Sequence, residues 1–530
     1  MECESVCAAA DRYKCSNAQL VGIVSAVLKA CDADLNDFSL SRTTSRSARK
    51  RARRKICSGQ RAKFITNKPS NCVLHWDGKM IKEVLGANDE DFKEHLAIHI
   101  TDAIGYPEGK LLGAHCIKSS SGENQTEAII DALDDWELRN SIIGMGFDTT
   151  SSNSGKHKGA AVRVERVLGI KLLYLPCRHH ILEVVGGAAW KELFGDVKSP
   201  DNPWFKTFKD NWSQLDKSHP NFLDLSESCD WLKERSAETI ASLTKILTYE
   251  REYLPRHDYQ ELAELTLVVL GVEPPRGIHL RKPGALHQAR WMAVVIYTFK
   301  MFMYADEMQY TDDIKDKLRR LTTFYAVFYV RHWLSASKTA DAPMNDFELI
   351  QEMVRYEKED EGVAKLVIKK LKNQSWYLTK EFVTVLLFSD KATDLIKEKI
   401  AHKLRVLAET HDGKFRIGKP IFPVNPEKKT CVTDFIGDES LYLLEALQAS
   451  RDWLEMSPSL CSQVEAYQEA KKIVKGLKVT NDVAERGVTM ITEYATLITS
   501  DKEERQKLLQ VAEYHRGKFP KQTKSELNTQ

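Results

Sequence analysis

The sequence predicts a mixed α/β core whose elements run in the order βββαβαβ, interrupted by a large all-α insertion domain, so that the chain is mostly helical overall. Two observations lead to this prediction. Between residues 71 and 188, short apolar runs typical of strands alternate with segments of helical periodicity. From residue 189 to about residue 470, nearly every segment has helical periodicity and strand signals are scarce.

The composition limits the class of protein. At 530 residues and 42% hydrophobic content, the chain can form roughly two to four domains with sizeable cores. Its 77 Lys and Arg nearly balance its 75 Asp and Glu, so net charge gives no argument for a nucleic-acid partner. The first residues lack a signal-peptide pattern and the apolar runs are too short for a bilayer, so we expect no membrane partner. The 11 cysteines form no C-x-x-C pair, which is typical of reduced thiols in cytosol or nucleus.

Residues 1–38 predict a pair of helices, over 6–13 and 18–30, separated by a short polar break. Two short helices around such a break resemble a helix-turn-helix, which would bind DNA. A helical hairpin that only packs against the rest of the chain fits the same pattern.

Residues 39–70 predict a basic linker. Blocks of like charge repel one another and stay extended, and they attract phosphates or the nuclear-import machinery. We therefore expect a nuclear protein that contacts the DNA backbone here, with a solvated linker as the alternative. The basic residues are Arg42, Arg46, Arg49, Lys50, Arg51, Arg53, Arg54 and Lys55.

Two aspartates are expected to end neighbouring strands of the core. Strands are predicted over 73–77, 96–101, 111–117, 141–148 and 171–175, and helices over 123–138, 155–168 and 179–188. This order matches the ribonuclease-H-like fold, in which the first and fourth strands lie side by side. Asp77 ends the first strand and Asp148 the fourth, so both carboxylates are expected to face one point. A carboxylate at the end of an apolar strand is costly unless a cation or hydrogen-bond donors meet it.

The remainder of the chain is predicted to be helical. In the insertion domain, 189–470, helices are expected over 231–252, 259–270, 288–304, 313–333, 346–356, 378–387 and 394–410. Residues 471–515 are expected to complete the α/β core with C-terminal helices, including one over 482–498. Residues 516–530 have the composition of a disordered tail.

Five motifs, in this order, resemble those of a hAT-superfamily DNA transposase over residues 70–515. They are Asp77 after the first strand, Asp148 followed by Thr149 to Asn153, Cys177 with His180, Arg290 with Trp291, and Ala484-Glu485-Arg486. The chain departs from the family in two places. No zinc-binding BED finger is evident at its start, and Gly487-Val488-Thr489 follows Arg486 where the family often has x-Phe-Ser.

The resemblance implies Mg²⁺-dependent cleavage and strand transfer of double-stranded DNA by an Asp-Asp-Glu triad, Asp77, Asp148 and Glu485. These residues would hold two Mg²⁺ or Mn²⁺ ions about 4 Å apart. It also implies dimers or larger assemblies. A catalytically idle, transposon-derived factor that binds DNA or proteins is the alternative. A ribonuclease-H-type nuclease without strand transfer would need a fourth carboxylate, for which Asp89 and Asp131 are not convincingly placed.

The third carboxylate is chosen by likeness to the family alone. Asp482 is its nearest rival, and its position also suits the N-cap of the same helix. Cys177 and His180 would be structural or would position the substrate, although a buried cysteine and a satisfied histidine explain the pair as well.

Further DNA contacts are expected from Arg290 and Trp291, through a phosphate and a stacked base. Core packing is the alternative for Trp291. Lys156 and Lys158 follow Asp148 and would face DNA, or would form the solvated side of a helix.

Overall fold

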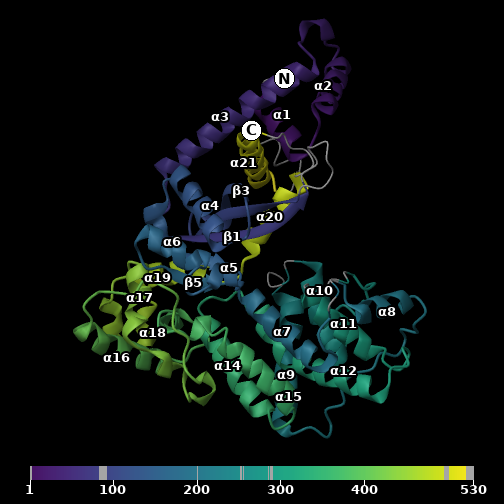
Figure 1. Cartoon of the computed structure of the whole chain (residues 1–530), viewed down its shortest axis with the longest axis vertical. Helices are drawn as coiled ribbons and strands as arrows, with labels where there is room; N and C mark the ends of the chain where they lie inside the picture. The colour runs from purple at the N-terminus through teal and green to yellow at the C-terminus, as the bar shows by residue number, and fades with distance from the viewer. Residues whose placement is uncertain are drawn as a thin grey trace. The chain divides into compact units, whose positions relative to one another are not determined.

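The computed structural model describes residues 3–82, 92–197, 199, 201–250, 254, 256–284, 286, 291–494 and 501–520. The chain divides into two compact units, and Figure 1 labels most of their helices and strands. We call the first the sheet unit; it comprises Met1–Tyr174, Ile417–Lys419 and Asn481–Gln530. The second, the helical unit, comprises Leu175–Arg416 and Pro420–Thr480. The coarse fold class is as predicted, a mostly helical chain with one mixed sheet.

The sheet contains five strands, and strand β5 runs across the boundary between the two units. The strands are β1 Cys72–Lys82, β2 Phe92–Asp102, β3 Tyr106–Ile117, β4 Ile142–Phe147 and β5 Leu173–Pro176. The helices of the sheet unit are α1 Glu4–Arg12, α2 Asn17–Ala30, α3 Arg42–Thr66, α4 Gly122–Asp135, α5 Ser151–Ser154, α6 Ala160–Leu168, α20 Asp482–Tyr494 and α21 Lys502–Lys518.

The α-helices of the helical unit follow one another without a strand among the described residues. They are α7 Arg178–Phe194, α8 Pro203–Asn211, α9 Asp230–Tyr249, α10 His257–Val269, α11 Trp291–Met303, α12 Asp312–Phe324, α13 Val330–Leu334, α14 Ala342–Tyr356, α15 Glu361–Lys372, α16 Asp394–Thr410, α17 Tyr442–Ala446, α18 Pro458–Cys461 and α19 Glu465–Gly476. None of the helices in the described part of the chain is both long enough and apolar enough to cross a membrane.

The strand order is β3-β2-β1-β4-β5. β1 pairs antiparallel with β2 and parallel with β4, and β2 pairs antiparallel with β3. The five predicted strands and the β1–β4 neighbourhood are therefore confirmed. The end of β1 is not where the sequence predicted it, because β1 continues beyond Asp77 to Lys82 and Asp77 pairs with Ala97 of β2. The apolar pattern stops at Asp77, but backbone pairing with β2 does not depend on that pattern.

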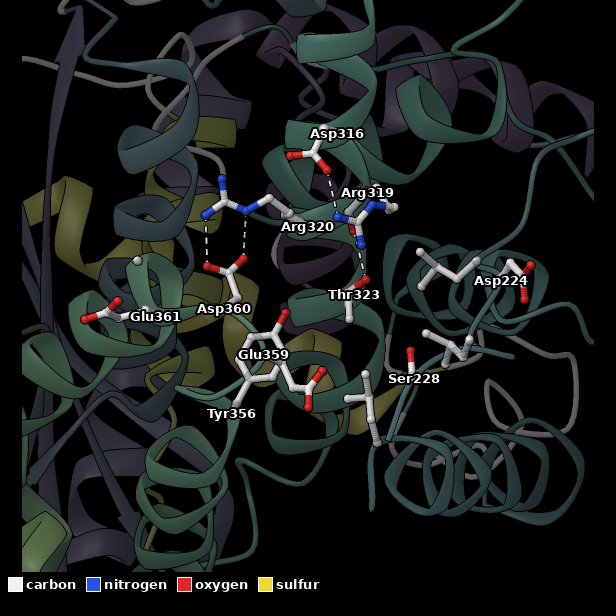
Figure 2. Close-up of a pocket in the computed structure, with 14 residues that line it drawn as sticks. Asp224, Ser228, Asp316, Arg319, Arg320, Thr323, Tyr356, Glu359, Asp360 and Glu361 are labelled. Atoms are coloured by element: carbon white, nitrogen blue, oxygen red, sulfur yellow. Dashed lines mark hydrogen bonds and ion pairs between the residues drawn. The ribbon is translucent and has the colours of Figure 1, made fainter. Parts of the chain in front are cut away.

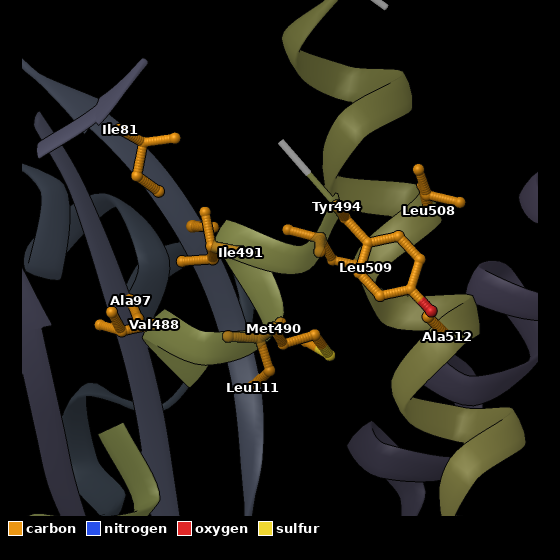
Figure 3. Packing of buried hydrophobic residues seen from close by; sticks show 11 residues of the cluster. Ile81, Ala97, Leu111, Val488, Met490, Ile491, Tyr494, Leu508, Leu509 and Ala512 are labelled. Carbon is orange, nitrogen blue, oxygen red and sulfur yellow. The ribbon is translucent and has the colours of Figure 1, made fainter. Parts of the chain in front are cut away.

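The two faces of the sheet are covered by different helices. On one face, the Trp76 indole donates to Gln125 of α4. On the other face, apolar side chains of β1, β2 and β3 pack against α20 and α21 in one core cluster (Figure 3). Its members are Ile81, Ala97, Leu111, Ala114, Val488, Met490, Ile491, Tyr494, Leu508, Leu509 and Ala512. The last segment of the chain thus completes the core of the sheet.

Helix α21 also covers the backbone of β3, the edge strand. Gln506 accepts a hydrogen bond from the amide of Ala114 over 2.9 Å and donates one to its carbonyl. One turn further along, Gln510 donates to the carbonyl of Leu111 over 2.7 Å, and Glu513 accepts from its amide over 2.7 Å. An open strand edge invites pairing with other chains. These side chains occupy part of that edge.

Residues 42–66, predicted as part of an extended basic linker, form the 25-residue helix α3 instead. Its buried side chains include Ala48, Ala52 and Ile56, at helical spacing. The like charges are tolerated because acidic residues from other helices neutralise several of them. Asp11 of α1, with a side chain 0% exposed, pairs with Arg49 over 2.6 Å and with Arg53 over 2.7 Å.

The prediction of an α-helix over 378–387, in the helical unit, is wrong. Two 3-10 turns, Trp376–Leu378 and Val383–Phe388, occupy this segment. All of their residues are buried, so the sequence shows high apolar content without one apolar stripe. The helix predicted over 313–333 is present as α12 and α13, joined by a π-helical turn at Tyr325–Tyr329.

A buried carboxylate holds β5 in the sheet unit. Glu165 of α6 accepts hydrogen bonds from the amides of Leu172 and Gly418, over 2.9 and 2.5 Å, and from the hydroxyl of Tyr174 over 3.0 Å. Burial nevertheless raises the pKa of Glu165 to about 6, because the charged form loses its hydration.

We therefore expect Glu165 to make the protein less stable at neutral pH than at pH 4. Its contribution is fully present below the unfolded-state pKa of about 4.3 and is lost as the pH rises through the folded-state pKa of about 6. Between pH 4 and pH 7 the free energy of unfolding of the wild type should fall by about 2 kcal/mol more than that of Glu165→Gln. Urea unfolding at both pH values measures this, and parallel changes in the two proteins would contradict it.

Candidate functional site

Asp77 lies in β1, and Asp148 directly follows the neighbouring strand β4 at a corresponding position. The last residues paired between β1 and β4 are His75 and Gly146, and each aspartate lies two residues further along its own segment. The rings of Trp76 and Phe147 stack with centroids 5.2 Å apart on the face of the sheet that α4 covers. Because successive side chains of a strand point to opposite faces, Asp77 is directed to the face that α20 covers, as is its paired residue Ala97. Both aspartates are half-buried.

Asp148 directly follows β4, as predicted, and its hydrogen bonds use only one oxygen. Oδ1 accepts from the amide of Thr150 over 3.1 Å, from its hydroxyl over 2.6 Å and from the side-chain amide of Asn153 over 2.5 Å. Within the described residues, Oδ2 has no hydrogen-bond partner. Asp148 is thus held in a fixed orientation with one oxygen available to a ligand.

Trp76 links the three segments that carry the predicted triad. Its indole nitrogen, in a side chain 1% exposed, donates to Asn153 over 2.9 Å as well as to Gln125 over 3.0 Å. Its carbonyl accepts from the side-chain amide of Asn481 over 3.2 Å. Asn481 directly precedes α20, and Trp76 directly precedes Asp77. The start of α20, β1 and the segment after Asp148 therefore meet around one residue.

Helix α20 docks against the sheet through glycines. A Cβ built on Gly487 would lie 2.0 Å from Cε1 of His99 in β2, so only a residue without a side chain fits there. In β3, a Cβ on Gly109, whose φ is +93°, would lie 2.4 Å from the side chain of Val483. Burial, and then the neighbouring His75, lower the pKa of His99 to about 3, which keeps its ring neutral at pH 7. The close approach fixes the helix that carries Glu485.

Both candidates for the third carboxylate lie on the first turn of α20. Glu485 donates its backbone amide to the carbonyl of Asn481 over 3.1 Å, and its side chain is exposed. Asp482 is half-buried. The structure places both near the Asn481–Trp76 contact and leaves the choice between them as open as the sequence did.

The ligand chemistry of these residues suits Mg²⁺, which prefers carboxylate oxygens. In the ranges that the structure describes, no three side chains of His, Cys, Asp or Glu form a ready-made metal-binding group. Mg²⁺ retains several waters and is commonly bound by one or two carboxylates together with substrate phosphates. Asp77 and Asp148, with the exposed Glu485, fit a Mg²⁺ site that is completed by water and substrate phosphates better than a site formed by protein ligands alone.

Exposed lysines lie in the loop between α5 and α6, close in sequence to Asp148. Lys156 and Lys158 are exposed, and Arg163 donates to the carbonyl of Lys158 over 3.2 Å. A Cβ on Gly122 would lie 2.2 Å from the carbonyl oxygen of Lys158, so this loop is closely packed. Burial, and then the charge of Lys156, lower the pKa of Lys419. The lysines form a positively charged surface on the sheet unit.

Among the α3 residues predicted to contact DNA, Arg49 and Arg53 do not fit that role, because their guanidinium groups pair with the buried Asp11. Lys50 pairs with Glu504 over 3.7 Å, and Lys55 pairs with Glu4 over 2.5 Å. Arg51 and Arg54 are exposed. The outward-facing charge of α3 is therefore smaller than its sequence suggests.

The remaining predicted residues belong to the helical unit. Cys177 is 4% exposed and precedes α7, while His180 pairs through Nδ1 with Glu183 over 3.3 Å. His179 is a core residue, stacked on Trp333 with ring centroids 3.9 Å apart. Arg290 and the side chain of Trp291 lie outside the described residues.

Three residues that position the site were not singled out from the sequence: Trp76, Asn153 and Asn481. Asn153 ends the Asp148 motif and Trp76 lies in the predicted strand 73–77, but their hydrogen bond joins residues 77 positions apart. Asn481 contacts Trp76 across 405 positions. The only sequence feature that could have identified these three residues is that each is polar, or carries a polar group, close in sequence to an expected carboxylate.

A comparison of the sequence with models of known protein families and with curated protein sequences finds no match.

Proposed function

We propose that the sheet unit cleaves phosphodiester bonds in double-stranded DNA with Mg²⁺ or Mn²⁺, in the manner of an Asp-Asp-Glu transposase. The observation that carries the proposal is the convergence at Trp76 of the segments bearing Asp77, Asp148 and Glu485. The strand order β3-β2-β1-β4-β5, with an antiparallel meander of β1, β2 and β3 and a parallel β1–β4 pair, supports a ribonuclease-H-like core.

The residues have distinct roles in this proposal. Asp77, Asp148 and Glu485 would hold the ions, which when bound activate an attacking oxygen and stabilise the departing one. Asn153 positions Asp148 by donating a hydrogen bond to Oδ1, so that Oδ2 can bind a metal ion. Trp76 holds Asn153 and Asn481 in place and is therefore a positioning residue.

The DNA backbone is expected to contact exposed cations of the same unit. Lys156 and Lys158 lie on the closely packed loop that follows the Asp148 segment. Arg51 and Arg54 of α3 are exposed as well. Contacts of this kind bind phosphates without reading sequence, so they account for affinity and not for a preferred target.

Cleavage of end-labelled duplex DNA by the full-length protein, with Mg²⁺ and with Mn²⁺, tests the proposal. Asp77→Asn and Asp148→Asn are each expected to slow cleavage about a thousandfold, because the metal ions supply several kcal/mol of transition-state stabilisation. Asp134→Asn, at an exposed aspartate of α4 in the same unit, is the matched control and should cleave normally. The cleavage rates of Glu485→Gln and Asp482→Asn are also compared, and the variant that slows cleavage more identifies the third carboxylate.

Two outcomes would contradict this function. Cleavage that survives both Asp77→Asn and Asp148→Asn would show that these aspartates are not the site. Binding of the duplex without cleavage in either metal would support a catalytically idle DNA-binding factor instead.

A further inference from the structure

A cavity of about 430 Å³ lies within the helical unit, lined by residues of α9, α12, α14, α15 and the segments beside them (Figure 2). Its lining has more negative than positive charge. The charged residues are the carboxylates Asp224, Asp316, Glu359, Asp360 and Glu361 and the arginines Arg319 and Arg320. Five carboxylates against two guanidinium groups leave an excess of negative charge, which favours a cationic ligand.

Both arginines already have carboxylate partners. Arg320 forms a bidentate pair with Asp360, with Nε–Oδ2 and NH2–Oδ1 distances of 2.8 and 2.9 Å. Arg319 pairs with Asp316 over 2.7 Å. Glu361 is neutralised by Lys365, which lies outside the lining. An anionic ligand would have to displace one of these carboxylates, whereas a cation would not.

Two carboxylates of the lining remain without a cationic partner among the described residues. Asp224 accepts a hydrogen bond from the amide of Ser226 over 2.9 Å, and Glu359 is exposed at the end of the segment before α15. Figure 2 shows them on opposite sides of the cavity, with Tyr356 beside Glu359. A positive group in the cavity would be attracted by both.

The hydroxyl group of a largely buried tyrosine also lines this space. Tyr356 is 3% exposed, lines the cavity and packs its ring against Phe328, with centroids 5.0 Å apart. Its hydroxyl has no hydrogen-bond partner among the described residues, and Figure 2 shows it between Asp360 and Thr323. Burial, and then the charge of Asp360, raise its pKa, so it remains a neutral phenol. The phenol oxygen can accept a hydrogen bond from an N–H donor of a ligand in the cavity.

The lining also contains apolar side chains. Leu223 and Leu232 are 6% and 3% exposed, and Leu225 lies beside them. An alkyl chain can pack against these leucines while its charged end reaches the tyrosine and the carboxylates. We propose that this cavity binds an organic cation, an alkylguanidinium or alkylammonium group with an aliphatic stem. The site lies in a different unit from the DNA site and does not depend on it.

Calorimetric titration of the full-length protein with agmatine and with putrescine tests this site. Saturable binding is expected, and Tyr356→Phe should weaken it about tenfold, because a hydrogen bond to a charged donor is lost. Glu359→Gln should weaken it several-fold and reduce its sensitivity to salt. Tyr304→Phe removes a tyrosine hydroxyl outside the cavity and should leave binding unchanged. Glu357→Gln, which neutralises a carboxylate outside the lining, is the control for Glu359→Gln.

The source of the cation is distinguished by a third probe, a short neutral-ended peptide with one central arginine. Tighter binding of this peptide than of agmatine would assign the cavity to a side chain of a protein partner, and the reverse would assign it to a free amine or guanidine. The proposal is overturned if none of the three cations binds saturably. It is also overturned if inorganic phosphate binds and the Arg319→Gln variant no longer binds phosphate. Circular dichroism of each variant verifies that it is folded.

Discussion

Gly487→Ala is expected to lower the free energy of unfolding of the sheet unit by about 3 kcal/mol or more. The new Cβ would lie 2.0 Å from a ring atom of His99, which is 5% exposed and surrounded by the core. Overpacking a core usually costs about 1–3 kcal/mol, and here neither the helix nor the buried ring has space to move. Hydrogen exchange of amides in β2 and α20, together with urea unfolding, measures the effect.

Gly59→Ala is the matched control, since Gly59 lies within α3 and an added Cβ there would have no neighbouring atom within 4 Å. There the change should stabilise the protein by up to about 1 kcal/mol, because alanine favours helix. The double variant Gly487→Ala/His99→Ala should be more stable than the sum of the two single effects predicts. Simple additivity would show that the two residues do not collide.

We expect Asp11→Asn to lower the free energy of unfolding by about 3–5 kcal/mol. The asparagine has a similar shape but leaves Arg49 and Arg53, with side chains 8% and 13% exposed, without the buried anion that both contact. Removing one member of a buried ion pair leaves an uncompensated charge, which costs more than the pair itself contributes. Hydrogen exchange in α1 and α3 should show where stability is lost.

Asp37→Asn, at an exposed aspartate in the same N-terminal region, should change the free energy of unfolding by less than about 0.5 kcal/mol. Because Asp11 is buried, the difference between the two variants should persist at high salt, whereas a surface effect would be screened. A loss at Asp11 no larger than that at Asp37 would contradict the structural role of the pair.

The sheet could be predicted because its signals are local. Each strand appears as a short apolar run, and the order of strands and helices limits the topology to a few alternatives. Asp148 was therefore placed correctly at the end of β4. The end of β1 was missed because exposed residues such as Gly78 and Lys79 continue the strand through backbone pairing alone.

Long-range contacts account for what the sequence did not predict. The charge of α3 is neutralised largely by Asp11, 38 residues before Arg49, so no local pattern identified the helix. Gly487 and His99 fit each other across the sheet unit, and neither residue alone indicates where α20 docks. The cavity at Tyr356 is assembled from several helices, and its lining residues have no common motif.

The capping of β3 by α21 has a consequence for the synthesis of the protein. Gln506, Gln510 and Glu513, which cover the edge strand, are translated after the whole helical unit, about 300 residues later than β5. At roughly 5–20 residues per second, this corresponds to about 15–60 s. During that interval the nascent sheet has an open edge and an uncovered apolar face. We therefore expect the unfinished chain to depend on ribosome-associated chaperones, and release before α21 to yield aggregates.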